Sequence, residues 1–456
     1  MNASRTNTSV VILAAGQGKR MRSALPKVLQ PLAGRPVLQH VIDCSRETGA
    51  ADICIVYGHG GTAVKEAFAN EPVRWVWQEQ QLGTGHAAQR AVTGTPDDNI
   101  VLILSGDVPL LKPQTLATLL QSCKGPELAV LTVDMQNPHG YGRIIRKNGH
   151  VVGNVEQKDA SADEQAITEI NSGVLCAPAR LLKRWLAELD NDNAQGEYYL
   201  TDVIRMAAAE GIIVHGVRAD DWKEVMGIND RKQLAQAERV LQQRLVEELM
   251  AQGVSFADPQ RVDIRGTLRC GSDVFIDVNC VFEGDVVLGD NVRIESSNVL
   301  RNSGLGSGTV LHPHCHLDGA NTGPDCEIGP FSRLRPGVEM ENNVKVGNFV
   351  EIKKSRIASG SKVNHLSYIG DTTIGRNVNV GAGTITCNYD GAAKHHTVIG
   401  DGAFIGSGVE LVAPVDIGAG ATIGAGSTIS KSAPADTLTL ARAKQVSVPH
   451  WKKPRK

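Results

Sequence analysis

The chain has 456 residues, more than one domain usually contains, so we expect two or three domains rather than a single compact core. Its 47 basic and 49 acidic residues nearly balance, which excludes the strong positive field with which proteins bind nucleic acid or anionic membranes. Its nine cysteines are scattered without a Cys-x-x-Cys pair, and no apolar run approaches the length of a membrane-spanning helix, so we expect a cytoplasmic protein that acts on small molecules.

The first half of the chain alternates strand-like and helical segments. Apolar runs at residues 10–15, 52–57, 100–104 and 128–133 are separated by helical stretches such as 36–48 and 114–121. This alternation is typical of βαβ units on a parallel sheet and predicts a Rossmann-like, doubly wound nucleotide-binding domain over residues 1–230.

Residues 231–252 predict one long linker helix. Leu234, Leu241, Leu245 and Leu249 share a stripe, Asp230 with Gln233 can cap the start, and Gly253 can end the helix. At about 1.5 Å per residue it would extend roughly 33 Å, enough to separate two bodies.

From Gly253 on, an apolar residue recurs every six positions, and 27 of the 48 glycines lie in this part of the chain. A period of six fits neither a helix nor a simple alternating strand, but it suits a solenoid of short strands that turn a corner in each repeat. A β-sandwich with accidental spacing is the alternative. Corners favour glycine and leave little room for large aromatic residues.

The repeat resembles the hexapeptide-repeat left-handed parallel β-helix, which implies a trimeric acyltransferase over residues 253–456. The three series are Ile264, Cys270, Ile276, Phe282, Leu288, Ile294 and Leu300; Ile328, Leu334, Met340, Val346 and Ile352; and Ile399, Ile405, Leu411, Ile417, Ile423 and Ile429.

A glycine-rich loop follows the first strand-like run. Residues 13–27 read Leu-Ala-Ala-Gly-Gln-Gly-Lys-Arg-Met-Arg-Ser-Ala-Leu-Pro-Lys. Gly16 and Gly18 let the backbone bend around phosphate groups, while Arg20 and Lys27 offset anionic charge. The loop lacks the Gly-Lys-Ser/Thr ending of the P-loop and the third glycine of the dinucleotide fingerprint. It therefore predicts a different kind of triphosphate cradle.

This segment resembles the sugar-phosphate nucleotidyltransferases, in which it reads approximately L-A-A-G-x-G-T-R-M and ends in P-K. Lys19 stands where that family has threonine, and Ser105 stands where tyrosine is common. Further matches follow in order at residues 81–85, 105–109, 140–143, 155–158, 171–173 and 227–229. Together they resemble the uridylyltransferase half of bacterial bifunctional enzymes that combine an N-acetylglucosamine-1-phosphate uridylyltransferase with a glucosamine-1-phosphate acetyltransferase.

Uridylyl transfer needs charge neutralisation and in-line positioning of two anions. Asp107 follows a buried strand and suits Mg²⁺ as an oxygen ligand, and the resemblance adds Asn229 as a second ligand. The resemblance also implies catalytic roles for Arg20 and Lys27. It implies that Gln78, Gly83 and Thr84 bind uracil and that Gly142, Glu156 and Asn171 bind the sugar. Further nucleotide or sugar contacts are implied for Leu13, Ala14, Ala15, Gly16, Lys27, Ser105, Gly106, Asp107 and Asn229.

Polar residues interrupt the six-residue repeat at 333–336, 353–354, 365–368 and 383–391, and the last of these begins an insertion. Acyl transfer from a thioester needs a base for the attacking amine and stabilisation of an oxyanion. Histidine suits the first task near neutral pH, and we assign His365 as the general base. The region resembles the acetyltransferase half of the same bifunctional family. This implies phosphate binding by Arg335 and Lys353, sugar binding by Tyr368 and Asn379, and an acetyl-CoA groove lined by Ala382, Asn388, Tyr389, Ser407, Ala425 and Arg442.

We therefore expect a Mg²⁺-dependent bifunctional transferase that uses acetyl-CoA, UTP, glucosamine-1-phosphate and N-acetylglucosamine-1-phosphate, as a homotrimer without nucleic-acid or membrane partners. One alternative is a single-activity nucleotidyltransferase with a structural or regulatory β-helix, and another is a regulatory subunit that has lost its site. By resemblance, the basic tail from Ser447, with Lys452, Lys453, Arg455 and Lys456, would touch the CoA of a neighbouring subunit.

Overall fold

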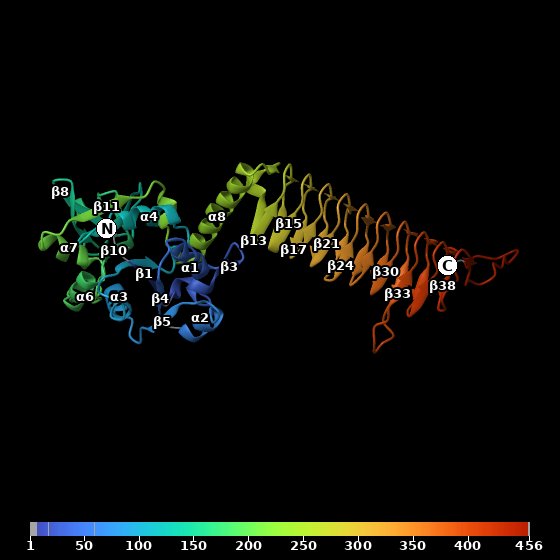
Figure 1. Cartoon of the computed structure of the whole chain (residues 1–456), viewed down its shortest axis with the longest axis horizontal. Helices are drawn as coiled ribbons and strands as arrows, with labels where there is room; N and C mark the ends of the chain where they lie inside the picture. The colour runs from blue at the N-terminus through green and yellow to red at the C-terminus, as the bar shows by residue number, and fades with distance from the viewer. Residues whose placement is uncertain (1–6, 17, 59, 455–456) are drawn as a thin grey trace, which may run out of the picture. The chain divides into compact units, whose positions relative to one another are not determined.

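The computed structural model describes residues 7–16, 18–58 and 60–454, and the chain divides into two compact units between Leu241 and Gln242 (Figure 1). The boundary falls inside α8 (Arg231–Ala251). No helix among the described residues combines the length and the apolar character needed to cross a bilayer.

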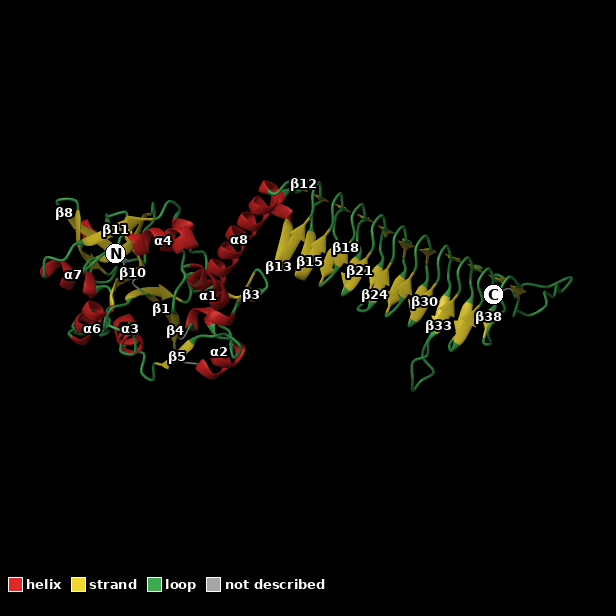
Figure 2. Ribbon diagram, viewed as in Figure 1, coloured by secondary structure: helices red, strands yellow, loops and turns green. Residues whose placement is uncertain are grey.

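The first unit is built on a mixed sheet that, in the described part of the chain, has nine strands (Figure 2). The main strand order is β11-β7-β10-β6-β1-β4-β5, and β10 runs antiparallel to both β6 and β7. The expectation of a parallel sheet is therefore wrong for β10, although the βαβ units around β1 are present. The strands are β1 (Thr8–Ala14), β4 (Asp52–Tyr57), β5 (Arg74–Trp77), β6 (Ile100–Ser105), β7 (Leu128–Asp134), β8 (Arg143–Lys147), β9 (His150–Val155), β10 (Glu169–Pro178) and β11 (Val214–Arg218), beside a hairpin of β2 (Pro31–Leu32) and β3 (Arg35–Pro36).

Helices cover both faces of this sheet. Because alternate residues of a strand point to opposite faces, Val10 and Ile12 of β1 join one apolar cluster and Val11 joins the other. Leu38 and Leu116 bring two helices to the first cluster. The helices are α1 (Val37–Glu47), α2 (Gly61–Ala67), α3 (Thr84–Val92), α4 (Pro113–Gln121), α5 (Ala162–Gln165), α6 (Ala179–Ala187) and α7 (Asp202–Ala209), with short 3₁₀ turns η1 (Lys19–Met21), η2 (Lys27–Leu29) and η3 (Trp222–Val225).

The ends of α8 follow the sequence signals. The Gln233 backbone N–H donates to Asp230 Oδ1 at 2.8 Å, and the Asn229 backbone N–H donates to Gln233 Oε1 at 2.7 Å. At the other end, Gly253 adopts φ +99°, a conformation that favours glycine. The helix therefore begins and ends where capping chemistry predicts.

The second unit is a parallel β-helix whose coils stack in two long ladders (Figure 2). One ladder contains β12 (Ser255–Phe256), β14 (Phe275–Ile276), β16 (Arg293–Ile294), β19 (Val310–Leu311), β22 (Glu327–Ile328), β25 (Lys345–Asn348), β28 (Lys362–His365), β31 (Asn379–Val380), β34 (Phe404–Ile405), β37 (Thr422–Ile423) and β39 (Leu438–Thr439). The other contains β13 (Val262–Cys270), β15 (Cys280–Leu288), β17 (Val299–Arg301), β18 (Gly304–Leu305), β20 (His316–Asp318), β21 (Ala320–Thr322), β23 (Arg333–Leu334), β24 (Val338–Met340), β26 (Glu351–Lys353), β27 (Arg356–Ile357), β29 (Tyr368–Gly370), β30 (Thr372–Ile374), β32 (Ile385–Cys387), β33 (Thr397–Ile399), β35 (Glu410–Val412), β36 (Val415–Ile417) and β38 (Thr428–Ile429). A further 3₁₀ turn, η4 (Pro259–Arg261), precedes β13.

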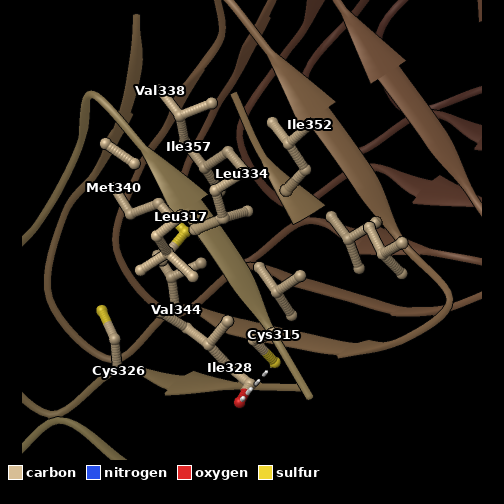
Figure 3. Close-up of a cluster of buried hydrophobic side chains, with 14 of the residues drawn as sticks. Cys315, Leu317, Cys326, Ile328, Leu334, Val338, Met340, Val344, Ile352 and Ile357 are labelled. Atoms are coloured by element: carbon tan, nitrogen blue, oxygen red, sulfur yellow. Dashed lines mark hydrogen bonds between the residues drawn. The ribbon is translucent and has the colours of Figure 1, made fainter. Parts of the chain in front are cut away.

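The six-residue positions fill one continuous apolar core along this unit. Figure 3 shows Leu317, Ile328, Leu334 and Ile352 packed there, each buried. Of the predicted positions, Cys270 is only partly buried and packs against the edge of the core. The period of six therefore marks the inward-facing side chains.

Glycine makes many tight corners, as expected, for example Gly284 (φ +68°) and Gly408 (φ +64°), but it shares this role with other residues. Asn, Asp and even aromatic residues adopt positive φ at many corners, for example Asn279 at +61° and Phe331 at +56°. Glycine is needed where coils approach each other closely: a Cβ on Gly347 would lie 2.0 Å from the backbone oxygen of Asn364 in the next coil.

Candidate functional sites

A cleft of about 480 Å³ opens in the first unit where β1 and β6 end. Leu13 and Ser105 are register partners in these parallel strands, so the loops that follow them meet at one edge of the sheet. The cleft brings together most of the expected nucleotide residues: Leu13, Ala14, Ala15, Gly16, Lys27, Gln78, Gly83, Thr84, Ser105 and Asp107, beside Val28, Gln81, Ala87 and Glu197. Gly106, another expected nucleotide residue, donates its backbone N–H to the Leu13 carbonyl at 2.9 Å.

Three polar side chains converge at this cleft. Lys27 forms a short ion pair with Asp107, and its Nζ lies 3.2 Å from Asn229 Oδ1. The Ile228 backbone N–H donates to the Asp107 carbonyl at 2.9 Å, which ties Asn229 to the end of β6. A carboxylate oxygen and an amide oxygen therefore surround one positive charge, and this donor set suits a hard cation.

Arg20 lies elsewhere. It belongs to η1 and lines a separate hollow with Lys19, Arg22, Arg231 and other residues, whereas Lys27 faces the main cleft. Gly18 (φ +61°) immediately precedes η1, and a Cβ there would meet the Lys27 Cβ at 2.8 Å. The two predicted catalytic cations therefore line different hollows.

The residues expected to read uracil are held rigidly. Gln78 is buried, and its amide nitrogen lies 3.2 Å from the Gly83 carbonyl and 3.1 Å from His86 Nδ1. Gly83 has φ +112°, and a Cβ there would lie 2.6 Å from the Tyr198 carbonyl, so no other residue fits without displacing the backbone.

The residues expected to bind sugar form a second group connected to the cleft. The Leu200 backbone N–H donates to the hydroxyl of Thr84, and the Thr201 hydroxyl donates to Glu156 Oε1 at 3.0 Å. Burial raises the pKa of Glu156 above its ordinary value.

Gly142 and Asn171 lie beside each other. The Asn171 backbone N–H donates to the Gly142 carbonyl at 2.9 Å, and Asn171 Oδ1 accepts from the Gly173 backbone N–H at 2.9 Å. The Asn171 Nδ2 group is buried without a partner in the described residues, as expected of a donor that awaits a ligand.

In the second unit, His365 ends β28 beside Asn348 of β25, its register partner one coil earlier. His365 Nδ1 lies 3.0 Å from Asn348 Oδ1. Since the amide oxygen only accepts, Nδ1 carries the proton in this arrangement and Nε2 keeps its lone pair. His365 can therefore act as a base through Nε2.

The predicted phosphate ligands stack on adjacent coils. The Arg335 backbone N–H donates to the Ile352 carbonyl, which places Arg335 beside Lys353, and Arg335 Nη1 donates to Glu351 Oε1 at 2.9 Å. A hydrogen bond with Lys394, from the 383–398 insertion, lowers the pKa of Lys353 from its ordinary value. Lys353, Lys394 and Arg335 therefore concentrate positive charge here, which favours an anionic ligand.

Tyr368 and Asn379 lie on different ladders of the β-helix. Tyr368 begins β29, opposite Glu351, and Asn379 begins β31, opposite Lys362.

The residues expected in the acetyl-CoA groove occupy later coils. Ala382, Ser407 and Ala425 lie in one row. The Ala382 carbonyl accepts a hydrogen bond from the N–H of the glycine that follows Ser407, and the Ser407 carbonyl accepts one from the N–H of the glycine that follows Ala425. Arg442 Nη1 reaches the Ala425 carbonyl at 2.7 Å. Asn388 Nδ2 donates to Asp371 Oδ2 at 2.5 Å, and the Tyr389 hydroxyl donates to the Gly391 carbonyl at 2.6 Å.

The basic tail is only partly described. Lys452 and Lys453 are exposed, whereas Arg455 and Lys456 lie outside the described residues.

Sequence reasoning did not identify Asn154, Thr201, Glu197 or Asn348. Asn348 had a detectable signal, because it precedes His365 by 17 residues, which is one turn of the solenoid. Glu197, Asn154 and Thr201 carry no such pattern.

Comparisons with known proteins cover both units. Residues 10–208 match the MobA-like NTP transferase domain, and residues 396–431 match the bacterial transferase hexapeptide (six repeats). The hexapeptide match confirms the expected left-handed parallel β-helix.

The "Bifunctional protein GlmU" of Aromatoleum aromaticum is 56% identical over 446 residues, with 98% of each chain covered. That of Herminiimonas arsenicoxydans is 52% identical, with 98% of this chain and 99% of the relative covered. A solved UDP-glucose pyrophosphorylase complexed with UDP-glucose is 17% identical with a TM-score of 0.42, over 52% of this chain and all of that one.

Proposed function

The chain belongs to the family of bifunctional GlmU proteins, and from this premise we propose that its two units make UDP-N-acetylglucosamine in two steps. The second unit transfers the acetyl group of acetyl-CoA to glucosamine-1-phosphate. The first transfers the uridylyl group of UTP to the resulting N-acetylglucosamine-1-phosphate and releases pyrophosphate. The observation that carries the proposal is that each unit has its own cluster of converging polar side chains, around Asp107 in one and His365 in the other.

Uridylyl transfer requires the sugar phosphate oxygen to attack the α-phosphorus of UTP in line with the leaving pyrophosphate. The backbone around Gly16 supplies N–H groups to the phosphates, and Lys27 supplies a positive charge on the floor of the same cleft. Gln78 and Thr84 orient the base, and Asn171 presents to the sugar its Nδ2 group, which has no hydrogen-bond partner within the described part of the chain. The chain therefore acts mainly by positioning and charge neutralisation.

Magnesium fits the pair Asp107 and Asn229, because their oxygens already converge on the Lys27 ammonium, a positive charge at that position. When bound, Mg²⁺ neutralises charge that develops on the phosphates. Two protein ligands are enough, since Mg²⁺ usually keeps several waters and substrate oxygens. Within the described ranges no cluster of three or more His, Cys, Asp or Glu side chains offers an alternative metal site.

Acetyl transfer requires a neutral amine to attack the thioester carbonyl. With Nδ1 held by Asn348, His365 accepts the amine proton at Nε2. The new C–N bond forms as the C–S bond breaks, and the CoA sulfur leaves as thiolate and takes up a proton. Arg335 and Lys353 hold the sugar phosphate, so that the amine is presented to the base.

We also propose a cytoplasmic homotrimer. Support comes from an exposed apolar row on successive corners of the β-helix, where Phe331, Phe349 and Leu366 are 48%, 56% and 64% exposed. The Phe331 and Phe349 rings stack with centroids 5.4 Å apart. Such a row is typical of a protein interface. Sedimentation equilibrium tests this expectation, and a monomer at micromolar concentration would contradict it.

The proposed function is tested by incubating the purified chain with glucosamine-1-phosphate, acetyl-CoA, UTP and Mg²⁺ and then omitting each component in turn. UDP-N-acetylglucosamine should form only in the complete mixture. Without acetyl-CoA, added N-acetylglucosamine-1-phosphate should restore the product. If the product forms only when the acetylated sugar phosphate is supplied, the acetyltransferase assignment is wrong.

A further inference from the structure

The Glu156 carboxylate accepts hydrogen bonds from two side chains that are far from each other in the sequence. Asn154 Nδ2 and the Thr201 hydroxyl both lie 3.0 Å from the same carboxylate oxygen, Oε1. Asn154 belongs to β9, two residues before Glu156, whereas Thr201 precedes α7. Among the described residues, none donates a hydrogen bond to the second oxygen, Oε2.

The chemistry of the two hydrogen bonds fixes how the Asn154 amide and the Thr201 hydroxyl are oriented. A carboxylate only accepts, so the Thr201 hydroxyl and the Asn154 amide nitrogen must donate. A flipped Asn154 would place its oxygen against the carboxylate, which is repulsive. The Asn154 Oδ1 atom instead lies against Gly142, where a Cβ would come within 2.6 Å of it. The Asn154 side chain is thus fixed between Gly142 and Glu156.

The surroundings of Glu156 make these two donors important. Burial raises the pKa of Glu156, and the negative charges of Asp159 and Asp202 act in the same direction. The hydrogen bonds from Thr201 and Asn154 act in the opposite direction, since they stabilise the ionised form. Asp159 itself lies near the Tyr199 hydroxyl, at 3.3 Å.

We propose that Asn154 and Thr201 are positioning residues that hold the Glu156 carboxylate by one oxygen, so that Oε2 is presented to an N–H or O–H donor of the sugar phosphate. The inference rests on the proposed uridylyl transfer to a sugar-1-phosphate. Neither residue needs to touch the sugar. Both act through Glu156, by fixing its orientation and keeping it ionised.

The test uses the full chain and measures uridylyl transfer to N-acetylglucosamine-1-phosphate as a function of pH. Thr201→Val removes the hydroxyl at nearly constant volume. Because a hydrogen bond to a charged group is worth more than an ordinary one, KM for the sugar phosphate should rise about tenfold at neutral pH, while KM for UTP stays within about twofold. The acidic limb of kcat/KM should move to higher pH, since Glu156 then takes up a proton more readily.

Three further variants make the test selective. Asn154→Ala should give the same pattern as Thr201→Val, and Thr201→Ser, which keeps the hydroxyl, should return both KM and the acidic limb to near wild type. Thr118→Val is the matched control, because its hydroxyl donates only to the Gln114 carbonyl on the exposed surface of α4. Because Thr201 and Asn154 belong to the first unit, an unchanged KM for UTP, which binds in that unit, reports whether each variant is folded.

The inference is overturned if Thr201→Val and Asn154→Ala leave the sugar KM and the acidic limb unchanged. It is equally overturned if KM for UTP rises as much as KM for the sugar, or if Thr201→Ser behaves like Thr201→Val. A wild-type chain that fails to uridylylate the sugar phosphate would instead refute the proposed function, so the two failures are distinguishable.

Discussion

Asp107 offers the most direct test of the uridylyl site, because its side chain and its backbone have separate roles. The side chain pairs with Lys27, and the two side chains are 21% and 12% exposed. The backbone carbonyl accepts from the Ile228 N–H, a contact that Asp107→Ala keeps. The substitution therefore removes charge at the cleft without removing the link to Ile228.

The expected changes follow from these contacts. Loss of a partly buried, charge-assisted pair should lower the free energy of unfolding by about 1–2 kcal/mol. For a unit of this size, that corresponds to a fall in Tm of roughly 2–8 °C. Uridylyl transfer should fall at least about 1000-fold, or roughly 4 kcal/mol in activation free energy, because Asp107 both orients Lys27 and would hold Mg²⁺.

The assay follows pyrophosphate release and CoA release on the same protein preparation. Acetyl transfer should remain within about twofold of wild type, since His365 belongs to the other unit. Asp98→Ala is the matched control, an exposed aspartate just before the opposite end of β6. If Asp107→Ala keeps more than a tenth of the Mg²⁺-dependent uridylyl activity, or if both activities fall together, the proposed role of Asp107 is wrong.

Two further substitutions test the second unit. His365→Ala should lower acetyl transfer by about 100- to 10,000-fold and spare uridylyl transfer, as expected for loss of a general base; an equal fall in both reactions would contradict the assignment. His312 concerns stability: burial alone would lower its pKa, but hydrogen bonds and charge from Glu295 and Glu327 outweigh burial and raise the pKa above its ordinary value of 6.5. The charged imidazole therefore adds stability that is fully present below pH about 6.5 and is lost as the pH rises through the folded-state value. His312→Gln should lower Tm more at pH 6 than at pH 8.5, and an equal difference at the two pH values would refute this reasoning.

The second unit was readable from the sequence because its architecture imposes one inward side chain on every sixth residue. Ile328, Leu334 and Ile352 are accordingly buried in one core. The corners were less readable, because Gly284 and Gly408 have positive φ as expected of glycine, but Asn279 and Phe331 have positive φ as well. The core pattern depends on burial, which the sequence displays as apolarity. Corner geometry also depends on stacking between coils, which single residues do not display.

The first unit shows a different limit. A strand that is buried on both faces has the same apolar character in either direction, so residues 169–178 gave no sign that β10 runs antiparallel. The cleft was nevertheless predictable, because Gly16 and Asp107 directly follow strands that end at the same edge. Asn154 and Thr201 were not predictable, since each matters only through a contact with Glu156 that folding creates.

The division between the two activities can be tested by truncation within α8. Ala237 is fully buried and packs with Leu32, Leu110 and Ile228, so the first turns of α8 complete the core of the first unit. Ile228 also donates to the Asp107 carbonyl, so this core supports the uridylyl site directly. A chain that ends at residue 230 exposes these side chains and should lose roughly 3 kcal/mol or more of stability, because burying one aliphatic side chain contributes about 1.5–3 kcal/mol. A chain that ends at residue 253 keeps them and should retain uridylyl transfer without acetyl transfer. Urea unfolding and both assays on the two truncated chains measure the difference. Equal stability of the two would mean that α8 is only a connection and contributes nothing to the first core.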